Sequence, residues 1–245
     1  MHRFFISSDQ AVGETLYVEG SDVNHIRNVL RMRPGEDFEA VDENGLVYTC
    51  RIDTLDKNQV TAKVLFTEPS DAELPNRIVL FMGLPKFEKM ELIIQKAVEL
   101  GVAAVVPVKT ARCVVKLDEK RAASKQQRWQ GIAESAAKQS KRSLIPPVEN
   151  VMSYKEALAL AATMDHVLIP YEKAEGIEES RAAIASVKNG ESVAVFIGPE
   201  GGFELSEVEE ALAIGAKSIT LGPRILRCET AAITTLSILM YALTT

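Results

Sequence analysis

Two glycine-anchored loops near the C-terminus constrain the fold of this chain more than any other feature. They are Ile197–Phe203, with the sequence IGPEGGF, and Leu221–Ala231, with the sequence LGPRILRCETA. Each loop follows a short apolar run typical of a buried parallel strand, at Ser192–Ile197 and Ser218–Leu221, and each precedes a helical pattern. Open α/β sheets bind ligands at the carboxyl ends of parallel strands. We therefore expect the two loops to converge on one small molecule.

The residue types in the first loop suit this interpretation. Gly198, Gly201 and Gly202 permit a positive φ and a close approach of the backbone to a ligand, and Pro199 stiffens the entry. The alternative is that Gly-Pro and Gly-Gly only mark a turn before a helix. Either loop taken alone leaves both interpretations open.

The C-terminal two thirds of the chain alternates between strand and helix patterns, which predicts a mainly parallel sheet covered on both faces. The predicted strands are Ile78–Met82, Val102–Val108, His166–Pro170, Val193–Ile197 and Ser218–Leu221. The predicted helices are Phe87–Leu100, Ser124–Ser140, Tyr154–Ala162, Ile177–Val187 and Thr230–Leu243. In the first helix, Phe87, Met90, Ile94 and Ala97 share one apolar face, and Ser206 with Glu209 is a candidate capping box for a further helix.

Residues 1–66 are mostly β in pattern. The predicted strands are Arg3–Ile6, Thr15–Val18, Asp37–Val41, Leu46–Ile52 and Gln59–Phe66. Glu43-Asn44-Gly45 predicts a hairpin turn, and a helix is expected from an N-cap at Ser21 to about Leu30. These patterns predict a compact barrel, followed by a polar linker with two prolines at Thr67–Asn76.

Composition excludes several classes of protein. With 47% hydrophobic and 25% charged residues, the chain can build a core, and no apolar run approaches the ~20 residues of a membrane span. The N-terminus lacks the pattern of a secretory signal. Cys50, Cys113 and Cys228 are odd in number and far apart, and the three histidines are scattered, so neither a disulfide framework nor a metal site is expected. We expect a cytoplasmic protein with no membrane partner.

The charge of the chain is unevenly distributed. The formal net charge is −6, but Lys109–Arg142 holds ten Lys or Arg against three Asp or Glu, which is a local net charge of +7. Arg3, Arg27, Arg31 and Arg33 add basic residues near the N-terminus. A basic patch of this kind is typical of nucleic-acid binding. A solvated helix face is the alternative explanation for part of it.

Three more segments complete a pattern that spans nearly the whole chain in order. They are His25–Arg31, Lys96–Val102 and Glu134–Arg142. Together with the two glycine loops they resemble the ribosomal RNA small subunit methyltransferase E family, which belongs to the SPOUT class of S-adenosylmethionine-dependent RNA methyltransferases. One departure is Cys228, which stands where threonine is more often expected.

The resemblance implies a fold of class α/β with two domains. Residues 1–68 would form a PUA-like RNA-binding β domain, and residues 76–245 a SPOUT methyltransferase domain whose C-terminal segment makes a trefoil knot. It also implies a homodimer paired through helices beside the knot. The helix pattern at Thr230–Leu243 is apolar nearly all round, which agrees with burial on more than one side.

The resemblance further implies the cofactor, S-adenosylmethionine, and the residues of its site. The residues implied to bind it are Leu168, Ile169, Pro170, Ile197, Gly198, Pro199, Glu200, Gly201, Gly202, Leu221, Gly222, Ile225, Leu226, Arg227, Thr230 and Ala231. No metal is implied. Arg227, Glu229 and Glu200 are the candidate catalytic residues, and an Arg227–Glu229 pair that only braces the knot is the alternative. The residues implied to bind RNA are Arg3, His25, Arg27, Arg31, Arg33, Lys138, Gln139 and Arg142.

The reaction implied is methylation of N3 of a uridine in 16S rRNA, free or within the small ribosomal subunit. Uracil N3 carries a proton, so an acid–base or anion-stabilising group is needed. Two alternatives stay open: a SPOUT ribose 2′-O-methyltransferase acting on tRNA or rRNA, and a non-catalytic RNA-binding protein. A nicotinamide-dependent dehydrogenase is disfavoured, because no G-x-G-x-x-G follows an early strand.

Overall fold

The computed structural model describes residues 1–174 and 176–244. The chain forms two compact units that do not follow chain order. Residues 1–73 and 137–145 make up the first unit, and residues 74–136 together with the segment from 146 onward make up the second. The predicted boundaries at 68 and 76 did not anticipate that the short segment 137–145 returns to the N-terminal unit.

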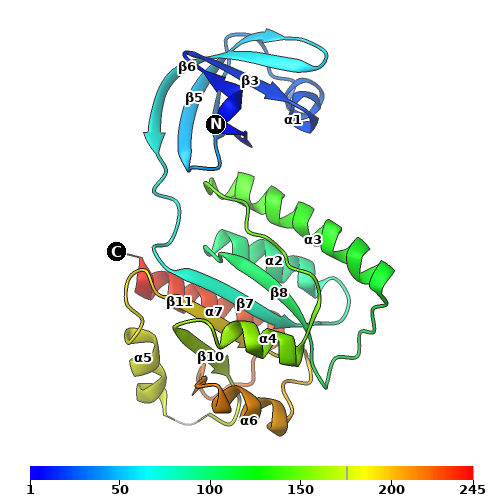
Figure 1. Cartoon of the computed structure of the whole chain (residues 1–245), viewed down its shortest axis with the longest axis vertical. Helices are drawn as coiled ribbons and strands as arrows, with labels where there is room; N and C mark the ends of the chain where they lie inside the picture. The colour runs from blue at the N-terminus through cyan, green and yellow to red at the C-terminus, as the bar shows by residue number, and fades with distance from the viewer. Residues whose placement is uncertain (175, 245) are drawn as a thin grey trace. The chain divides into compact units, whose positions relative to one another are not determined.

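The N-terminal unit contains a curled six-stranded sheet in the order β1-β4-β5-β6-β3-β2. Figure 1 labels β3, β5 and β6 of this sheet. The strands are β1 (Arg3–Phe5), β2 (Ala11–Val12), β3 (Thr15–Glu19), β4 (Asp37–Val41), β5 (Leu46–Leu55) and β6 (Gln59–Pro69). The helical elements are η1 (Ser8–Gln10), α1 (Ser21–Asn24) and the π-helical turn η2 (His25–Val29). β1 pairs with β4 in parallel and the other strand pairs are antiparallel.

Local sequence explains most of this unit. Gly45, at φ +78°, closes the predicted hairpin, and its N–H donates to the Asp42 carbonyl. Two predictions were wrong in detail. Gly20, not Ser21, occupies the N-cap of α1, and the predicted linker begins later because β6 continues to Pro69 through its pairing with β5. Phe4, Leu16, Ile26 and Phe38 belong to the fully buried core of the unit.

Ion pairs attach the segment 137–145 to the N-terminal unit. Arg142, which is only 3% exposed, donates from Nε to Glu73 Oε2 at 3.1 Å, and the Ser143 N–H donates to the same carboxylate at 2.9 Å. Lys138 Nζ lies 2.9 Å from Asp22 Oδ1, and Lys141 Nζ lies 3.2 Å from Glu39. The carboxylates that pair with this segment are far from it in the sequence, so hydrophobic periodicity could not predict that residues 137–145 belong to the N-terminal unit.

The second unit is built on a six-stranded parallel sheet in the order β12-β10-β11-β7-β8-β9. Figure 1 labels its strands β7, β8, β10 and β11. Its strands are β7 (Arg77–Gly83), β8 (Ala104–Lys109), β9 (Met152–Ser153), β10 (His166–Pro170), β11 (Ser192–Ile197) and β12 (Lys217–Ile219). Its helices are α2 (Lys89–Glu99), α3 (Glu119–Gln139, whose last three residues belong to the first unit), α4 (Tyr154–Ala161), α5 (Ile177–Ala185), α6 (Leu205–Ala213) and α7 (Cys228–Leu243). The α/β class and the parallel sheet are confirmed.

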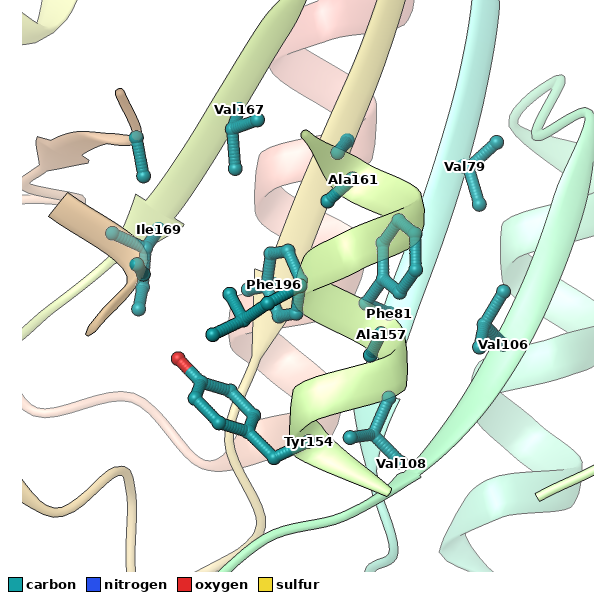
Figure 2. Close-up of a cluster of buried hydrophobic side chains, with 14 of the residues drawn as sticks. Val79, Phe81, Val106, Val108, Tyr154, Ala157, Ala161, Val167, Ile169 and Phe196 are labelled. Atoms are coloured by element: carbon teal, nitrogen blue, oxygen red, sulfur yellow. The ribbon is translucent and has the colours of Figure 1, made fainter. Parts of the chain in front are cut away.

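Alternate residues of the central strands face opposite layers. On one face, Phe81 and Phe196 stack with ring centroids 4.6 Å apart, and Tyr154 of α4 packs edge-on against Phe196 (Figure 2). α6 contributes Val208 to the same cluster. On the other face, α2 packs against α7, and α7 also contacts β11 and α5. The β11 and β7 strands are therefore covered on both faces, which explains their uninterrupted apolar sequences.

Two helix predictions in this unit need correction. Phe87 does not belong to the buried face of α2: the helix begins at Lys89, and Phe87 lies in the preceding loop with 87% of its surface exposed. Met90, Ile94 and Ala97 are buried as predicted. The capping box of α6 is formed by Glu204 and Glu207 rather than Ser206 and Glu209, because the helix begins at Leu205.

Candidate functional site

Three loops converge at the carboxyl ends of the neighbouring strands β12, β10 and β11. Together they line a cavity of about 690 Å³. The lining residues are Pro170, Tyr171, Glu172, Ala174, Gly176, Ile177, Ile197, Gly198, Pro199, Glu200, Gly201, Gly202, Phe203, Thr220, Leu221, Gly222, Pro223, Arg224, Ile225, Leu226, Cys228 and Ala231. This volume is in the range of small-molecule binding sites. Such sites typically have mostly apolar walls with a few polar groups. Both glycine loops thus contribute to one cavity.

The loop after β11 is a tight turn that requires glycine at two positions. The Gly202 N–H donates to the Pro199 carbonyl at 2.9 Å, and Gly202 has a φ of +67°. A Cβ on Gly198 would lie 2.9 Å from the Gly202 carbonyl carbon, closer than any real contact. Gly201 is different, since a Cβ there would meet only the flexible Arg112 side chain at 3.1 Å. Gly198 and Gly202 are therefore needed for the turn itself, whereas Gly201 is not.

Two residues outside the predicted site support this loop. Arg112 donates from Nη1 to the Gly201 carbonyl at 2.8 Å and lies 3.5 Å from Glu204. Gly83, the last residue of β7, lies against the loop so closely that a Cβ would be 2.6 Å from Pro199 Cδ. The sequence carried no pattern that pointed to either contact, because both partners are distant along the chain.

Lys89, at the first turn of α2, joins the two glycine loops through their carboxylates. Its Nζ lies 3.1 Å from Glu200 and 3.2 Å from Glu229. The Lys86 N–H also donates to Glu200, at 3.1 Å. Sequence analysis found both carboxylates but missed Lys89, whose spacing from them gives no sign of contact. Glu229 pairs with Lys89 rather than with Arg227, so the predicted alternative of an Arg227–Glu229 brace is wrong.

The cluster keeps both carboxylates ionised. Partial burial alone would raise the pKa of Glu200 and of Glu229, but their own backbone N–H groups and Lys89 hold both pKa values below the ordinary one. Burial opposes the charge of Lys89, yet the hydrogen bonds that its ammonium donates to the same carboxylates raise its pKa. Burial, with the neighbouring Glu229 carboxylate, raises the pKa of Cys228 to about 12. Its thiol donates to Glu229 at 3.3 Å, so Cys228 is a neutral cavity wall at physiological pH.

Most of the predicted cofactor residues line the cavity, but four do not. Leu168 and Ile169 are fully buried inside β10, and only Pro170 at its end reaches the cavity. Arg227 and Thr230 flank it, and the Arg227 side chain is exposed at the N-cap of α7. Sequence analysis did not name the lining residues of the loop after β10 and the start of α5, which are Tyr171, Glu172, Ala174, Gly176 and Ile177. The other unnamed lining residues lie in or directly beside the two glycine loops and are Phe203, Thr220, Pro223, Arg224 and Cys228. The loop after β10 contains no glycine-rich pattern.

The predicted RNA-binding residues all lie in the N-terminal unit, with different accessibility. Arg31 and Arg33 are exposed, and Arg27 and His25 are partly exposed on η2. Gln139 is exposed at the end of α3. The side chains of the other three already form ion pairs within the protein: Arg3 with Glu39, Lys138 with Asp22 and the buried Arg142 with Glu73.

Within the part of the chain that the structure describes, no three His, Cys, Asp or Glu side chains are grouped to hold a metal ion. The three cysteines are unpaired thiols. No described helix has both the length and the apolar content needed to cross a bilayer.

Comparison with known proteins decides the family. The RNA methyltransferase domain family matches residues 72–240, and the RNA methyltransferase PUA domain family matches residues 18–65. Ribosomal RNA small subunit methyltransferase E of Bacillus subtilis (strain 168) is 37% identical over 98% of this chain and 96% of its own length. The chain belongs to the ribosomal RNA small subunit methyltransferase E family. The resemblance inferred from the five sequence segments is confirmed.

Solved structures agree with membership of the methyltransferase E family. A ribosomal RNA small subunit methyltransferase E from Neisseria gonorrhoeae, crystallised with S-adenosylmethionine, has 35% identity and a TM-score of 0.84 over 97% of this chain and 96% of that one. A methyltransferase from Legionella pneumophila in complex with the same cofactor has 32% identity and a TM-score of 0.86, over 98% and 97% of the two chains. The SPOUT methyltransferase fold and the PUA domain predicted for this family member are thus confirmed.

Proposed function

We propose that this chain transfers a methyl group from S-adenosylmethionine to N3 of a uridine in 16S rRNA. The observation that carries the proposal is the cavity at the carboxyl ends of β10, β11 and β12, built from both glycine loops in a member of an rRNA methyltransferase family. Two relatives above 30% identity hold S-adenosylmethionine in their crystals. The family's name and the PUA domain family match support small-subunit rRNA as the substrate, and N3 of a uridine is the acceptor that the family resemblance implies.

The cavity fits the cofactor in size and chemistry. S-adenosylmethionine supplies an electrophilic methyl group on a sulfonium and also carries an ammonium, so carboxylates in the wall favour its binding. Glu172 supplies such a carboxylate, whereas the carboxylate of Glu200 in the same wall is already paired with Lys89. Gly198, Gly202 and Gly222 leave backbone groups accessible. Ile225 and Leu226 give apolar walls for a flat base such as adenine. Leu168 and Ile169 support this site from inside β10 and do not contact the cofactor.

Arg227 is the proposed stabiliser of the uridine anion. Uracil N3 must lose its proton for the methyl group to be accepted, and negative charge develops on the ring as it does so. The exposed Arg227 guanidinium has no ion-pair partner among the described residues and lies between two cavity-lining residues, Leu226 and Cys228. Glu200 and Glu229 are held ionised by Lys89 and can accept a proton, but their lowered pKa values make them weak bases.

The RNA is proposed to bind the N-terminal unit through His25, Arg27, Arg31, Arg33 and Gln139. Their side chains are exposed or partly exposed, and guanidinium groups bind phosphates well. Arg3, Lys138 and Arg142 are left out of the direct contacts, because their side chains are already paired with carboxylates. They hold the segment 137–145 in place instead.

Nucleoside mass spectrometry tests the proposed function. Digested 16S rRNA from cells with and without the gene for this chain should differ in 3-methyluridine, and the purified protein should restore it with S-adenosylmethionine. Loss of a ribose methylation with unchanged 3-methyluridine would identify the 2′-O-methyltransferase alternative. Binding of cofactor and RNA without any transfer would identify a non-catalytic RNA-binding protein. Either result would overturn the proposal.

We propose further that the active form is a cytoplasmic homodimer. The exposed apolar side chains on the packed helices α7 and α2, which are Ile238, Tyr241 and Leu92, support a second copy as partner. Leu239 is 0% exposed and packs inside the subunit, so its substitution does not test the interface. Tyr241→Asp is the suitable variant, since Tyr241 is 85% exposed. Light scattering should give twice the 26.8 kDa chain mass for the native protein, and the variant should give the single mass.

A further inference from the structure

Phe87 combines two unusual properties. It is a bulky residue with a φ of +56°, a backbone conformation that is strained for a side chain with a Cβ. It also exposes 87% of its surface, although an aromatic ring gains most from burial. Neither the fold of the β7–α2 loop nor its packing needs a phenylalanine here. Backbone strain of this kind persists where the surrounding structure imposes it, often at a functional site.

The residues on both sides of Phe87 are fixed to the edge of the cavity. The Lys86 N–H donates to Glu200 at 3.1 Å, and Lys89 Nζ lies 3.1 Å from the same carboxylate. Glu200 is itself a lining residue. These two contacts with Glu200 hold the loop in place, so Phe87 lies beside the cavity in a fixed segment of backbone.

We infer that Phe87 is a base-stacking residue for the RNA substrate. This inference rests on the proposed function, because it names the chain's contact with the nucleotide to be methylated or with its immediate neighbour. A base must be unstacked from its RNA neighbours for a methyl group to reach its N3 edge, and enzymes that act on bases hold such a base against aromatic side chains. The exposed Lys86 side chain beside the ring supplies positive charge for the RNA backbone. The position of the ring beside the proposed cofactor cavity favours a nucleotide over an apolar protein partner.

Glycine is the informative substitution at this position. Phe87→Gly removes the ring and at the same time relieves the positive φ, so the variant should be at least as stable as the native chain. Stacking of a base on an aromatic ring corresponds to about 5- to 150-fold in affinity. We therefore expect Phe87→Gly and Phe87→Ala to raise the KM for in vitro transcribed 16S rRNA by a factor in this range, with S-adenosylmethionine affinity unchanged. Phe87→Trp should retain native KM.

The experiment measures KM and kcat for 16S rRNA, cofactor affinity by calorimetry and thermal stability for the full-length variants. Leu212→Ala on α6 is the matched control, since Leu212 is 45% exposed and lies on a helix of the opposite layer. Native RNA kinetics in Phe87→Gly, or an equal loss in Phe87→Trp and Phe87→Ala, would overturn the inference. A change in mass by light scattering with native RNA affinity would overturn it too, in favour of a subunit contact. If the native chain methylates no RNA, the proposed function itself fails.

Discussion

Gly83→Ala is the substitution that most directly tests how the cavity is built. Gly83 ends β7 and is not part of either glycine loop. Its added Cβ would lie 2.6 Å from Pro199 Cδ and 2.8 Å from Pro199 N, both in the loop that lines the cavity. Ordinary contact begins at 3.4 Å, so the ring and backbone of Pro199 would have to move by about 0.8 Å.

The cost of this displacement follows from overpacking. A buried extra methyl group typically costs about 1–3 kcal/mol when its neighbours cannot move freely. Here the neighbour is a proline within a turn closed by the Gly202 N–H and held by Arg112, so little relaxation is available. The cost is divided between a lower free energy of unfolding and a weaker affinity for S-adenosylmethionine, which we expect to total about 1–3 kcal/mol.

Chemical denaturation and titration calorimetry measure the two parts. Gly131→Ala is the control, because Gly131 lies inside α3 with nothing within 4 Å of an added Cβ. That substitution should raise the free energy of unfolding by about 0.5–1 kcal/mol and leave cofactor affinity alone. A Gly83→Ala protein with native stability and native cofactor affinity would refute the argument that β7 sets the position of the loop.

Three further predictions concern other parts of the chain. Burial would raise the pKa of Glu73, but the buried Arg142 beside it holds that pKa below the ordinary value of 4.5. The pair therefore stabilises the fold fully above about pH 4.5, and this contribution is lost as the pH falls through the lowered pKa. Glu73→Gln should therefore cost about 3 kcal/mol at pH 7 and flatten the acid limb of stability measured by urea titration; an unchanged pH profile would contradict this. In native protein at pH 8, iodoacetamide should modify the partly exposed Cys113 well before Cys228, whose pKa burial raises to about 12, as peptide mass spectrometry can check. Replacing Arg27 and Arg31 with Ala should weaken RNA binding, reduce its salt dependence by about one unit of slope for each lost phosphate contact, and leave cofactor calorimetry unchanged; an equal salt slope would remove both side chains from the RNA surface.

Local sequence patterns were enough to predict the main elements and the family. Uninterrupted apolar strands between helical patterns predicted the parallel sheet, because strands buried on both faces need apolar side chains at every position. Strands β4 and β10 agree with their predicted residues at both ends. The two glycine loops were identified as cavity walls because glycine and proline encode their backbone conformation locally. The collinear segments named the family without any structural information.

Contacts between residues that are distant in the sequence could not be predicted from local patterns. Lys89 can pair with both Glu200 and Glu229 only because α2 lies beside the two loops. Gly83 packs against Pro199 only because β7 ends beside the first of these loops. Phe87 was assigned to a buried helix face because its spacing from Met90 and Ile94 fits a helical period. The anchoring of its neighbours to Glu200 starts the helix two residues later and leaves the ring exposed. Periodicity encodes which face of an element is apolar, whereas the partner that covers a face or binds a charge is set by three-dimensional packing.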